Sequence, residues 1–248
     1  VRHDLGRARL MLGQERAARG EDGGSDCAAA VREVTIALGR NGENPDFRQT
    51  LGKAHGLLGD LEDRARRDGR PDWERSAAAY AEAFAADPKL VDPGYQAGRF
   101  WLKIAVSDAT RQEDPVRRYA QAIAMLDAAL ERDPGHVPSR STRGYAWYLI
   151  GESQRKSDGD PRASFEKAIA DYDDVLRRGS QAADSWFQRA LVRMAMGRAR
   201  DARLPEAEEG DRGAIEDYSE GLKRRPADVE ARANRARAGR LMGDVLVA

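Results

Sequence analysis

The chain has 248 residues, of which 41% are apolar, 34% are charged and only 6% are aromatic. Few aromatics argue against a large globular core, while periodic apolar residues and mixed charges argue against disorder. Lys and Arg together number 42, the same as Asp and Glu, which argues against nucleic-acid binding. No apolar run approaches the roughly 18 residues of a membrane helix. Cys27 is the only cysteine, so no internal disulfide or multi-cysteine metal site can form.

Small residues recur along the chain at a fixed interval of 46 residues. The first column lies inside the helix that opens each unit, at Gly6, Gly52, Gly98, Gly144, Ala190 and Ala236. The second column lies seven residues later, at Gly13, Gly59, Ala105, Gly151, Gly197 and Gly243. The third column lies in the next helix, at Ala30, Ser76, Ala122, Ala168 and Ala214. Columns that keep one period through five units indicate a tandem-repeat array.

In chain order, the columns predict five full units and a terminal helix, at about 1–44, 45–90, 91–136, 137–182, 183–228 and 229–248. Each full unit is expected to form two antiparallel helices. The second helix is plainest in 168–176 and 214–222, where the apolar residues share one helix face. Prolines at positions 88, 134 and 226 are expected to end it, because proline cannot continue a helix. Prolines at 115 and 161 are expected in its first turn.

Three segments resemble a known family. Thr142–Tyr148 and Trp186–Ala190 are similar to the first helix of the tetratricopeptide repeat (TPR), and Ala214–Pro226 is similar to its second helix with the closing proline. The resemblance covers essentially the whole chain. It implies an all-α, right-handed superhelical solenoid of antiparallel helix pairs that forms a single domain over 1–248. It also implies a protein interaction scaffold, because the first helices of this family line a concave groove that takes partner peptides.

The unit departs from the family in length, because the usual TPR has about 34 residues and this one has 46. The additional residues all lie between the second and third columns, where the linkers are polar and rich in Gly, Pro and Asp. We expect the first helix to run one to two turns longer than usual and to be followed by a polar turn. The resulting ridge is either solvated padding or a second contact surface, and the sequence leaves both readings open.

Residue types that could support catalysis or metal binding are scattered. The histidines His3, His55 and His136 do not recur with the repeat, and pairs of acidic residues are typical of solvated helix faces. Cys27 follows a Gly-rich linker and is expected to be a small thiol near the surface. The sequence therefore predicts no catalytic residue, no metal site, no cofactor and no enzymatic activity.

A candidate partner-binding groove comes from the resemblance and from the residue after each member of the first column. This position holds Arg7, Lys53 and Arg99 in the first three units, and then Tyr145 and Leu191. Neighbouring groove candidates are Tyr95, Lys103, Tyr148, Phe187 and Met194. We expect acidic groups of a partner protein or peptide against the cations and apolar groups against the aromatic half. The family's carboxylate clamp is not reproduced, since its asparagine column reads Gln96, Thr142 and Gln188.

The sequence thus favours a non-catalytic scaffold that binds a protein or an extended peptide, without nucleic acid or membrane as partner. The alternatives are a regulatory or sensor region of a larger bacterial signalling enzyme, such as a Ser/Thr kinase, and a helical-repeat enzyme. Self-association through the array ends is a further alternative. The abundance of Arg, Ala, Gly and Asp suggests a GC-rich bacterial genome, and the chain reads as a piece of a longer protein. A cytoplasmic location is expected.

Overall fold

The computed structural model describes residues 1–40, 42, 44–179, 182–198 and 204–247. The described residues form helices joined by short turns, and none of them lies in a strand. The chain divides into two compact units, Val1–Ser139 and Arg140–Ala248, which we call the N-terminal and the C-terminal unit. The all-α fold of successive helices predicted from the sequence is confirmed.

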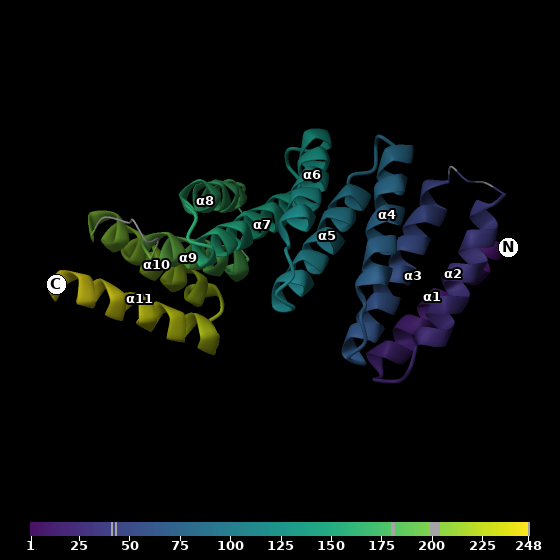
Figure 1. The fold of residues 1–248 in the computed structure, drawn as a ribbon, viewed down its shortest axis with the longest axis horizontal. Helices are drawn as coiled ribbons and strands as arrows, with labels where there is room; N and C mark the ends of the chain where they lie inside the picture. The colour runs from purple at the N-terminus through teal and green to yellow at the C-terminus, as the bar shows by residue number, and fades with distance from the viewer. Residues whose placement is uncertain (41, 43, 180–181, 199–203, 248) are drawn as a thin grey trace. The chain divides into compact units, whose positions relative to one another are not determined.

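The N-terminal unit consists of three helix pairs (Figure 1). Its helices are α1 (Arg2–Ala18), α2 (Gly24–Leu38), α3 (Pro45–Arg64), α4 (Arg70–Ala86), α5 (Asp92–Thr110) and α6 (Val116–Arg132). Each of these helices packs against the next one along the chain from α1 to α6. Within each pair the second helix runs back along the first: the start of α4 crosses the end of α3 at Gly59, and its middle lies beside Gly52.

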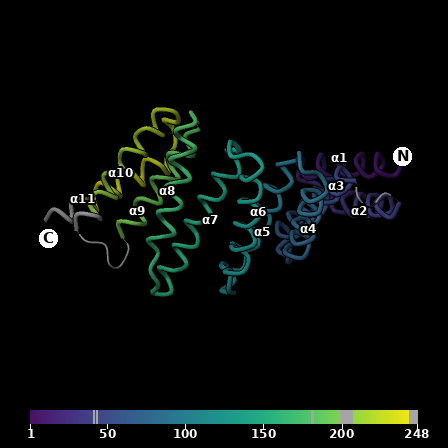
Figure 2. The backbone as a smooth tube through the Cα atoms, turned by 90° about the horizontal axis from the view of Figure 1, so that it is seen from above, coloured from purple at the N-terminus to yellow at the C-terminus, as the bar shows by residue number. Residues whose placement is uncertain are grey.

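The C-terminal unit contains the remaining helices (Figure 2). They are α7 (Val137–Lys156), whose first turn belongs to the N-terminal unit, α8 (Arg162–Arg177), α9 (Ala183–Gly197), α10 (Leu204–Arg224) and α11 (Val229–Val247). Helix α9 packs against α8 on one side and α10 on the other, and α10 also packs against α11.

Local sequence signals account for where the helices begin and end. The Asn44 side chain caps α3 by accepting hydrogen bonds from the amides of Asp46 and Phe47, at 2.9 and 3.2 Å. Helices α4, α6 and α10 each end two residues before a proline, at 88, 134 and 226. Helices α6 and α8 begin directly after Pro115 and Pro161, which are the N-cap residues and precede the first turn in which they were expected.

Glycines of the second column allow two helices to cross at backbone contact. A methyl group on Gly69, the N-cap of α4, would lie 2.2 Å from the carbonyl oxygen of Gly59 in α3. A methyl group on Gly23 would lie 2.3 Å from the carbonyl oxygen of Gly13 in α1. Real Cβ atoms do not approach oxygen so closely. The first two helix pairs can therefore cross at this distance only with glycine at these positions.

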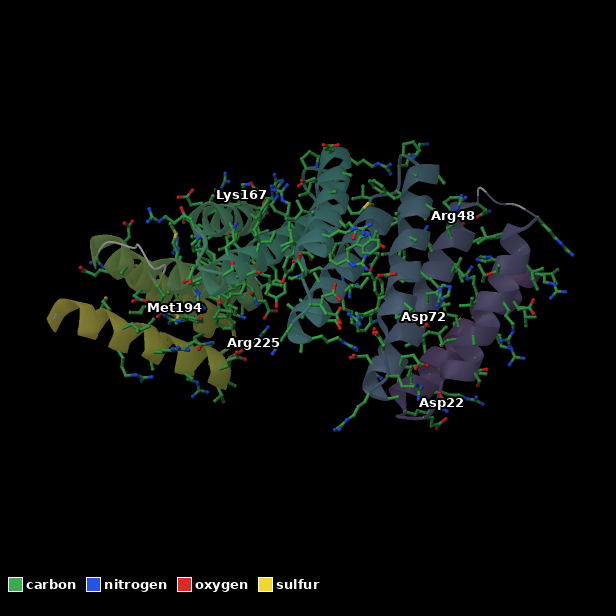
Figure 3. The ribbon with its side chains drawn as sticks, viewed as in Figure 1. Asp22, Arg48, Asp72, Lys167, Met194 and Arg225 are labelled. Carbon is green, nitrogen blue, oxygen red and sulfur yellow. The ribbon has the colours of Figure 1, made fainter. Side chains whose placement is uncertain are left out.

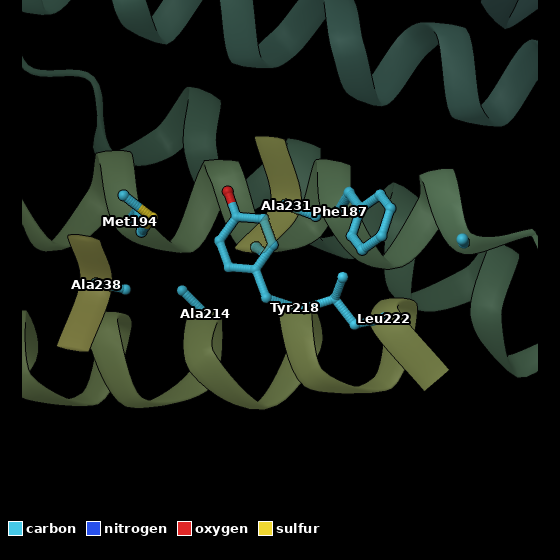
Figure 4. Close-up of a cluster of buried hydrophobic side chains, with 9 residues drawn as sticks. Phe187, Met194, Ala214, Tyr218, Leu222, Ala231 and Ala238 are labelled. Atoms are coloured by element: carbon cyan, nitrogen blue, oxygen red, sulfur yellow. The ribbon is translucent and has the colours of Figure 1, made fainter. Parts of the chain in front are cut away.

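The core is made of small residues interleaved with single aromatic rings. In the C-terminal unit, Phe165, Ala168 and Tyr172 of α8 pack against Val192 and Ala195 of α9. A second cluster joins α9, α10 and α11, with the Tyr218 ring at its centre (Figure 4). Burial of these apolar side chains is the main driving force for stacking one helix pair on the next.

One arginine fastens successive repeats of the N-terminal unit to each other. Arg132, at the end of α6, donates hydrogen bonds to the carbonyl oxygens of Phe84, Asp87 and Leu90, at 2.7, 3.0 and 2.9 Å. Its guanidinium also lies 3.3 Å from the centroid of the Phe84 ring. The last carbonyls of a helix have no partners within the helix, so Arg132 caps α4 from the following repeat.

The residues that lengthen the repeat extend both helices of a pair. Helix α3 continues from Gly59 to Arg64, and α4 begins at Arg70, six residues before Ser76 of the third column. Arg70 binds Asp108 at 2.8 Å and also binds Glu113, and both of these acids belong to the end of the next first helix and its linker. The extension therefore supplies ion pairs between neighbouring repeats.

Candidate partner-binding surfaces

The cationic half of the predicted groove lies on the first helices of the N-terminal unit. Arg7, Lys53 and Arg99 occupy equivalent positions on α1, α3 and α5, and all three are exposed. The preceding glycine of each helix faces the second helix of the pair, as Gly52 does toward the ring of Tyr80. One residue later the side chain has turned by about 100° around the helix axis. The repeat thus presents one cation per unit on the same side of each first helix.

These cations form no ion pair in the part of the chain that the structure describes, although Arg7 interacts electrostatically with Asp4, one turn earlier in α1. Arg7 and Lys53 have no ion-pair partner among the described residues, and Arg99 binds only the uncharged Gln96 side chain, at 2.7 Å. The Arg99 guanidinium also lies 5.7 Å from the ring centroid of Tyr95, a half-buried residue. The positive charge on this face is therefore available to an acidic partner.

Lys103 differs from the other three cations. Its ammonium binds the Asp60 carboxylate and lies 4.3 Å from the centroid of the buried Trp73 ring. A pocket of about 420 Å³ lies beside it at the extended helix ends, lined by Asp63, Trp73, Val106, Ser107, Thr110 and Arg111. Lys103 is thus engaged within the chain, and its contribution to a cationic surface is smaller than the sequence predicts.

The aromatic half of the prediction falls on the C-terminal unit, and only part of it is accessible. Tyr145 is exposed, its ring centroid lies 6.2 Å from that of Tyr148, and Tyr148 and Leu191 are half-buried. Phe187 and Met194, by contrast, are buried in the cluster around Tyr218 (Figure 4; Figure 3 also labels Met194). Their predicted place in the groove is wrong, because α10 and α11 cover the side of α9 from which they project.

Two buried ion pairs in the C-terminal unit escaped the sequence analysis. Arg143 of α7 donates two hydrogen bonds to Asp171 of α8, at 2.9 and 2.5 Å. Arg189 of α9 donates two to Asp217 of α10, at 2.9 and 2.6 Å, 46 residues further along. The signal that could have revealed them is an Arg and an Asp 28 residues apart, repeated once at the period of the array.

A polar surface surrounds Trp186 in the same unit. The guanidinium groups of Arg189 and Arg224 each lie 5.1 Å from its ring centroid. Pockets of about 540 and 370 Å³ open beside Trp186 and Arg189 over α8, α9 and α10. Because Arg189 is held by Asp173 and Asp217, the surface offers few free charges to a ligand.

The described residues contain no group of three or more His, Cys, Asp or Glu side chains that could hold a metal ion. Each histidine contacts a polar side chain: His3 contacts Thr50 at 3.0 Å, His55 contacts Asp72 at 2.8 Å, and His136 contacts Ser139 at 2.7 Å. Where the structure describes the chain, no helix is both long and apolar enough to cross a membrane.

Cys27 is fully buried in α2, where its sulfur faces Gly13 of α1, and the expected position near the surface is wrong. Burial, with smaller effects of Asp26 and Asp22, raises the pKa of the thiol to about 11. Since only the thiolate reacts, we expect native Cys27 to react with maleimide at least about 100-fold more slowly than a free thiol. Labelling followed by mass spectrometry measures this rate. The urea-unfolded chain should react at the normal rate, and equally fast labelling of the native protein would contradict the burial.

Comparisons with known proteins place the fold. No family model matches the chain, and no curated protein matches its sequence. Solved structures do match. MamA from Desulfovibrio magneticus RS-1 is 14% identical, with 92% of this chain and 99% of that chain covered and a TM-score of 0.58. A TPR protein from Parabacteroides merdae is 12% identical over 97% of this chain and 74% of its own, with a TM-score of 0.58.

A third match is YrrB, described as a TPR protein with an unusual peptide-binding site. It is 12% identical over 92% of this chain and 90% of its own, with a TM-score of 0.53. At these identities the matches establish the fold: the chain is a TPR-type array of helix pairs.

Proposed function

We propose that the chain is a non-catalytic scaffold that binds an acidic segment of a partner protein on the cationic face formed by Arg7, Lys53 and Arg99. The observation that carries the proposal is the regular placement of three exposed cations without an acidic partner among the described residues, one on each first helix of the N-terminal unit. The description of the structurally similar YrrB as a peptide-binding TPR protein supports a peptide as the ligand.

Several other cations of this unit are held in ion pairs between helices. Arg16 binds the buried Asp26 at 2.7 Å, Arg48 binds Glu82 at 3.1 Å and Arg118 binds Glu74. Cations that stabilise the fold are thus held by acids on neighbouring helices. The cations of the proposed face are free to attract a ligand, and such charges increase the rate and the specificity of association more than its strength.

The repeat sets the spacing that a ligand must match. Helices α1 and α3 contact each other, and packed helices lie about 8–10 Å apart. A peptide in the polyproline II conformation advances about 3.1 Å per residue with three residues per turn, so every third side chain lies on the same side. Acidic side chains at about every third position would therefore meet successive cations of the face.

Replacing two cations by acids should weaken binding of such a ligand. The probe is a fluorescein-labelled peptide with Glu at every third position and Leu or Tyr between, compared with the same peptide carrying Gln for Glu. Lys53→Glu with Arg99→Glu is expected to lower affinity for the Glu peptide about tenfold, since attraction at two sites becomes repulsion. Fluorescence anisotropy at low and physiological salt measures the affinity.

A matched control reverses two other cations of the same unit. Arg32 of α2 and Arg117 of α6 are exposed, lie on second helices and have no ion-pair partner within the described part of the chain. Arg32→Glu with Arg117→Glu changes the net charge equally and should leave the affinity within about twofold, after allowance for long-range charge. Equal losses in both double variants, or no preference for Glu over Gln, would overturn the proposed face.

A further inference from the structure

The crossing of α9 and α10 leaves a space that other helix pairs fill with a side chain. In the first, second and fourth pairs, Cys27, Trp73 or Phe165 lies over the second-column glycine, where an added methyl group would meet that side chain at 2.6, 2.4 or 2.4 Å. The equivalent residue of the fifth pair is Asp211. The three atoms nearest to a methyl group on Gly197 would all be backbone atoms of α10, at 3.0 to 3.7 Å. Asp211 therefore leaves the space beside Gly197 unfilled.

Asp211 is a buried acid without a partner. Only 3% of its surface is exposed. Among the described residues it forms no ion pair, and its Oδ1 atom has no hydrogen-bond partner. Burial raises the pKa of Asp211, and the positive charge of Arg198 opposes this increase. A carboxylate that has lost its water requires another donor, and the described part of the chain supplies none.

Two side chains near Asp211 also carry buried polar atoms without hydrogen-bond partners. These atoms are Nε and Nη2 of Arg198, at the end of α9, and the hydroxyl of Tyr218 in α10 (Figure 4). Arg198 directly follows Gly197, and Asp211 directly follows Gly210, where an added methyl group would lie 3.3 Å from the Cα atom of Gly197. Asp211 and Tyr218 both act electrostatically on Arg198. Unpaired donors and an unpaired acceptor thus gather at the crossing of the two helices.

The surroundings of Arg198 are rich in positive charge. Burial lowers the pKa of Arg198, and the charges of Arg237 in α11 and Arg155 in α7 lower it further. Arg198 is only half-buried, so the site reaches the surface. A ligand that satisfies both unpaired charges must present a negative group to Arg198 and a positive group to Asp211.

We propose that the space beside Gly197 binds a small α-amino acid, with its carboxylate against Arg198 and its ammonium group against Asp211. An α-amino acid carries both charges around one carbon atom, so a single small molecule satisfies the two buried groups together. The Tyr218 hydroxyl provides a further hydrogen bond. The space is what remains when Asp replaces a larger side chain, so glycine, alanine and serine fit and a large aromatic amino acid does not.

The two charges of the ligand can be tested separately. Isothermal titration calorimetry of the 248-residue chain with glycine, L-alanine and L-serine is expected to show saturable binding. Propionate lacks the ammonium group of alanine, and alaninamide lacks its carboxylate. Each should bind at least about tenfold more weakly than alanine, because it leaves one buried charge unpaired. L-Tryptophan should also bind at least about tenfold more weakly, because its side chain overfills the space.

Variants of Asp211 test the site from the side of the protein. Asp211→Phe introduces the residue that the fourth pair has at this position, Phe165. It should abolish binding and raise the midpoint of thermal unfolding, since an apolar side chain replaces an unpaired buried carboxylate. Asp211→Asn keeps the shape of the side chain and should weaken alanine binding at least about tenfold.

A matched control removes another carboxylate of the same unit. Asp184 is exposed and pairs with Arg225 at 2.9 Å, so Asp184→Asn should leave the affinity for alanine within about twofold. The charge reversals at Lys53 and Arg99 should also leave it unchanged, so failure of the cationic face and failure of this site are distinguishable.

Three results would overturn the proposal. One is the absence of saturable binding of glycine, alanine and serine, which would assign the unpaired polar atoms to bound water alone. Another is equal affinity for propionate and alanine. The third is alanine binding that survives in both the Asp211→Phe and the Asp211→Asn variant.

Discussion

Arg189→Leu is expected to lower the free energy of unfolding by about 3–5 kcal/mol, because it leaves a buried carboxylate without its main partner. Asp217 is only 2% exposed and accepts two hydrogen bonds from Arg189. Arg193 also lies 3.0 Å from the Asp217 carboxylate and remains in the variant, but it makes only a single contact with that group. Urea denaturation followed by far-UV circular dichroism measures the loss.

The matched double variant, Arg189→Leu with Asp217→Ala, should recover most of that stability and fall within about 1 kcal/mol of the wild type. Burial raises the pKa of Asp217 despite the opposing effect of Arg189 and Arg193, which shows that desolvation of the carboxylate outweighs its ion pairs. The second repeat carries Leu51 and Ala79 at the two positions, so the fold accepts an apolar pair there. A double variant as unstable as the single one would show that the ion pair itself stabilises the helix pair.

Gly69→Ala is expected to lower the free energy of unfolding of the N-terminal unit by about 3 kcal/mol. The backbone of Gly69 has φ −80°, which alanine adopts readily, so the cost is purely steric. The added methyl group would meet the carbonyl oxygen of Gly59 at 2.2 Å, and a backbone atom cannot turn aside as a side chain can. The two helices must separate, which opens the contact between Gly59 and the Trp73 ring.

Gly239→Ala is the control, and it is expected to raise the free energy of unfolding where Gly69→Ala lowers it. Gly239 lies within α11, and a methyl group there would meet no atom within 4 Å. Alanine should stabilise this helix by about 1 kcal/mol through its higher helix propensity. Denaturation curves of both variants decide the matter: equal, small effects at positions 69 and 239 would contradict the close crossing of α3 and α4.

The fold was predictable because the same sequence signals recur in successive repeats. Gly52 and Gly98, one period apart, mark helices that pack closely, and the prolines at 88, 134 and 226 mark helix ends. The site was less predictable, because a column of equivalent residues identifies a side of the helix and gives no measure of how deeply that side is covered. Phe187 and Met194 show this limit, since α10 and α11 bury them.

The ion pairs escaped prediction for a different reason. Arg143 and Arg189 occupy a position that is apolar in the second and third repeats. When the first helix is considered alone, a charged residue at this position predicts exposure to solvent. Only the acid 28 residues later, Asp171 or Asp217, reveals that the position is internal. Long-range pairing of this kind is visible in sequence when both members repeat, and it is lost when each column is read alone.

The Arg–Asp pairs distinguish the helix pairs α7–α8 and α9–α10 from the three earlier pairs of the array. A chimera with α4 in place of α8 would set Ala79 opposite Arg143 and leave a guanidinium facing a methyl group. The reverse exchange would bury Asp171 against Leu51. While the chain folds, every second helix resembles the others in its apolar stripe and could dock on the wrong neighbour. The charges penalise pairing of α8 or α10 with a first helix that lacks the arginine, which apolar packing alone could not do.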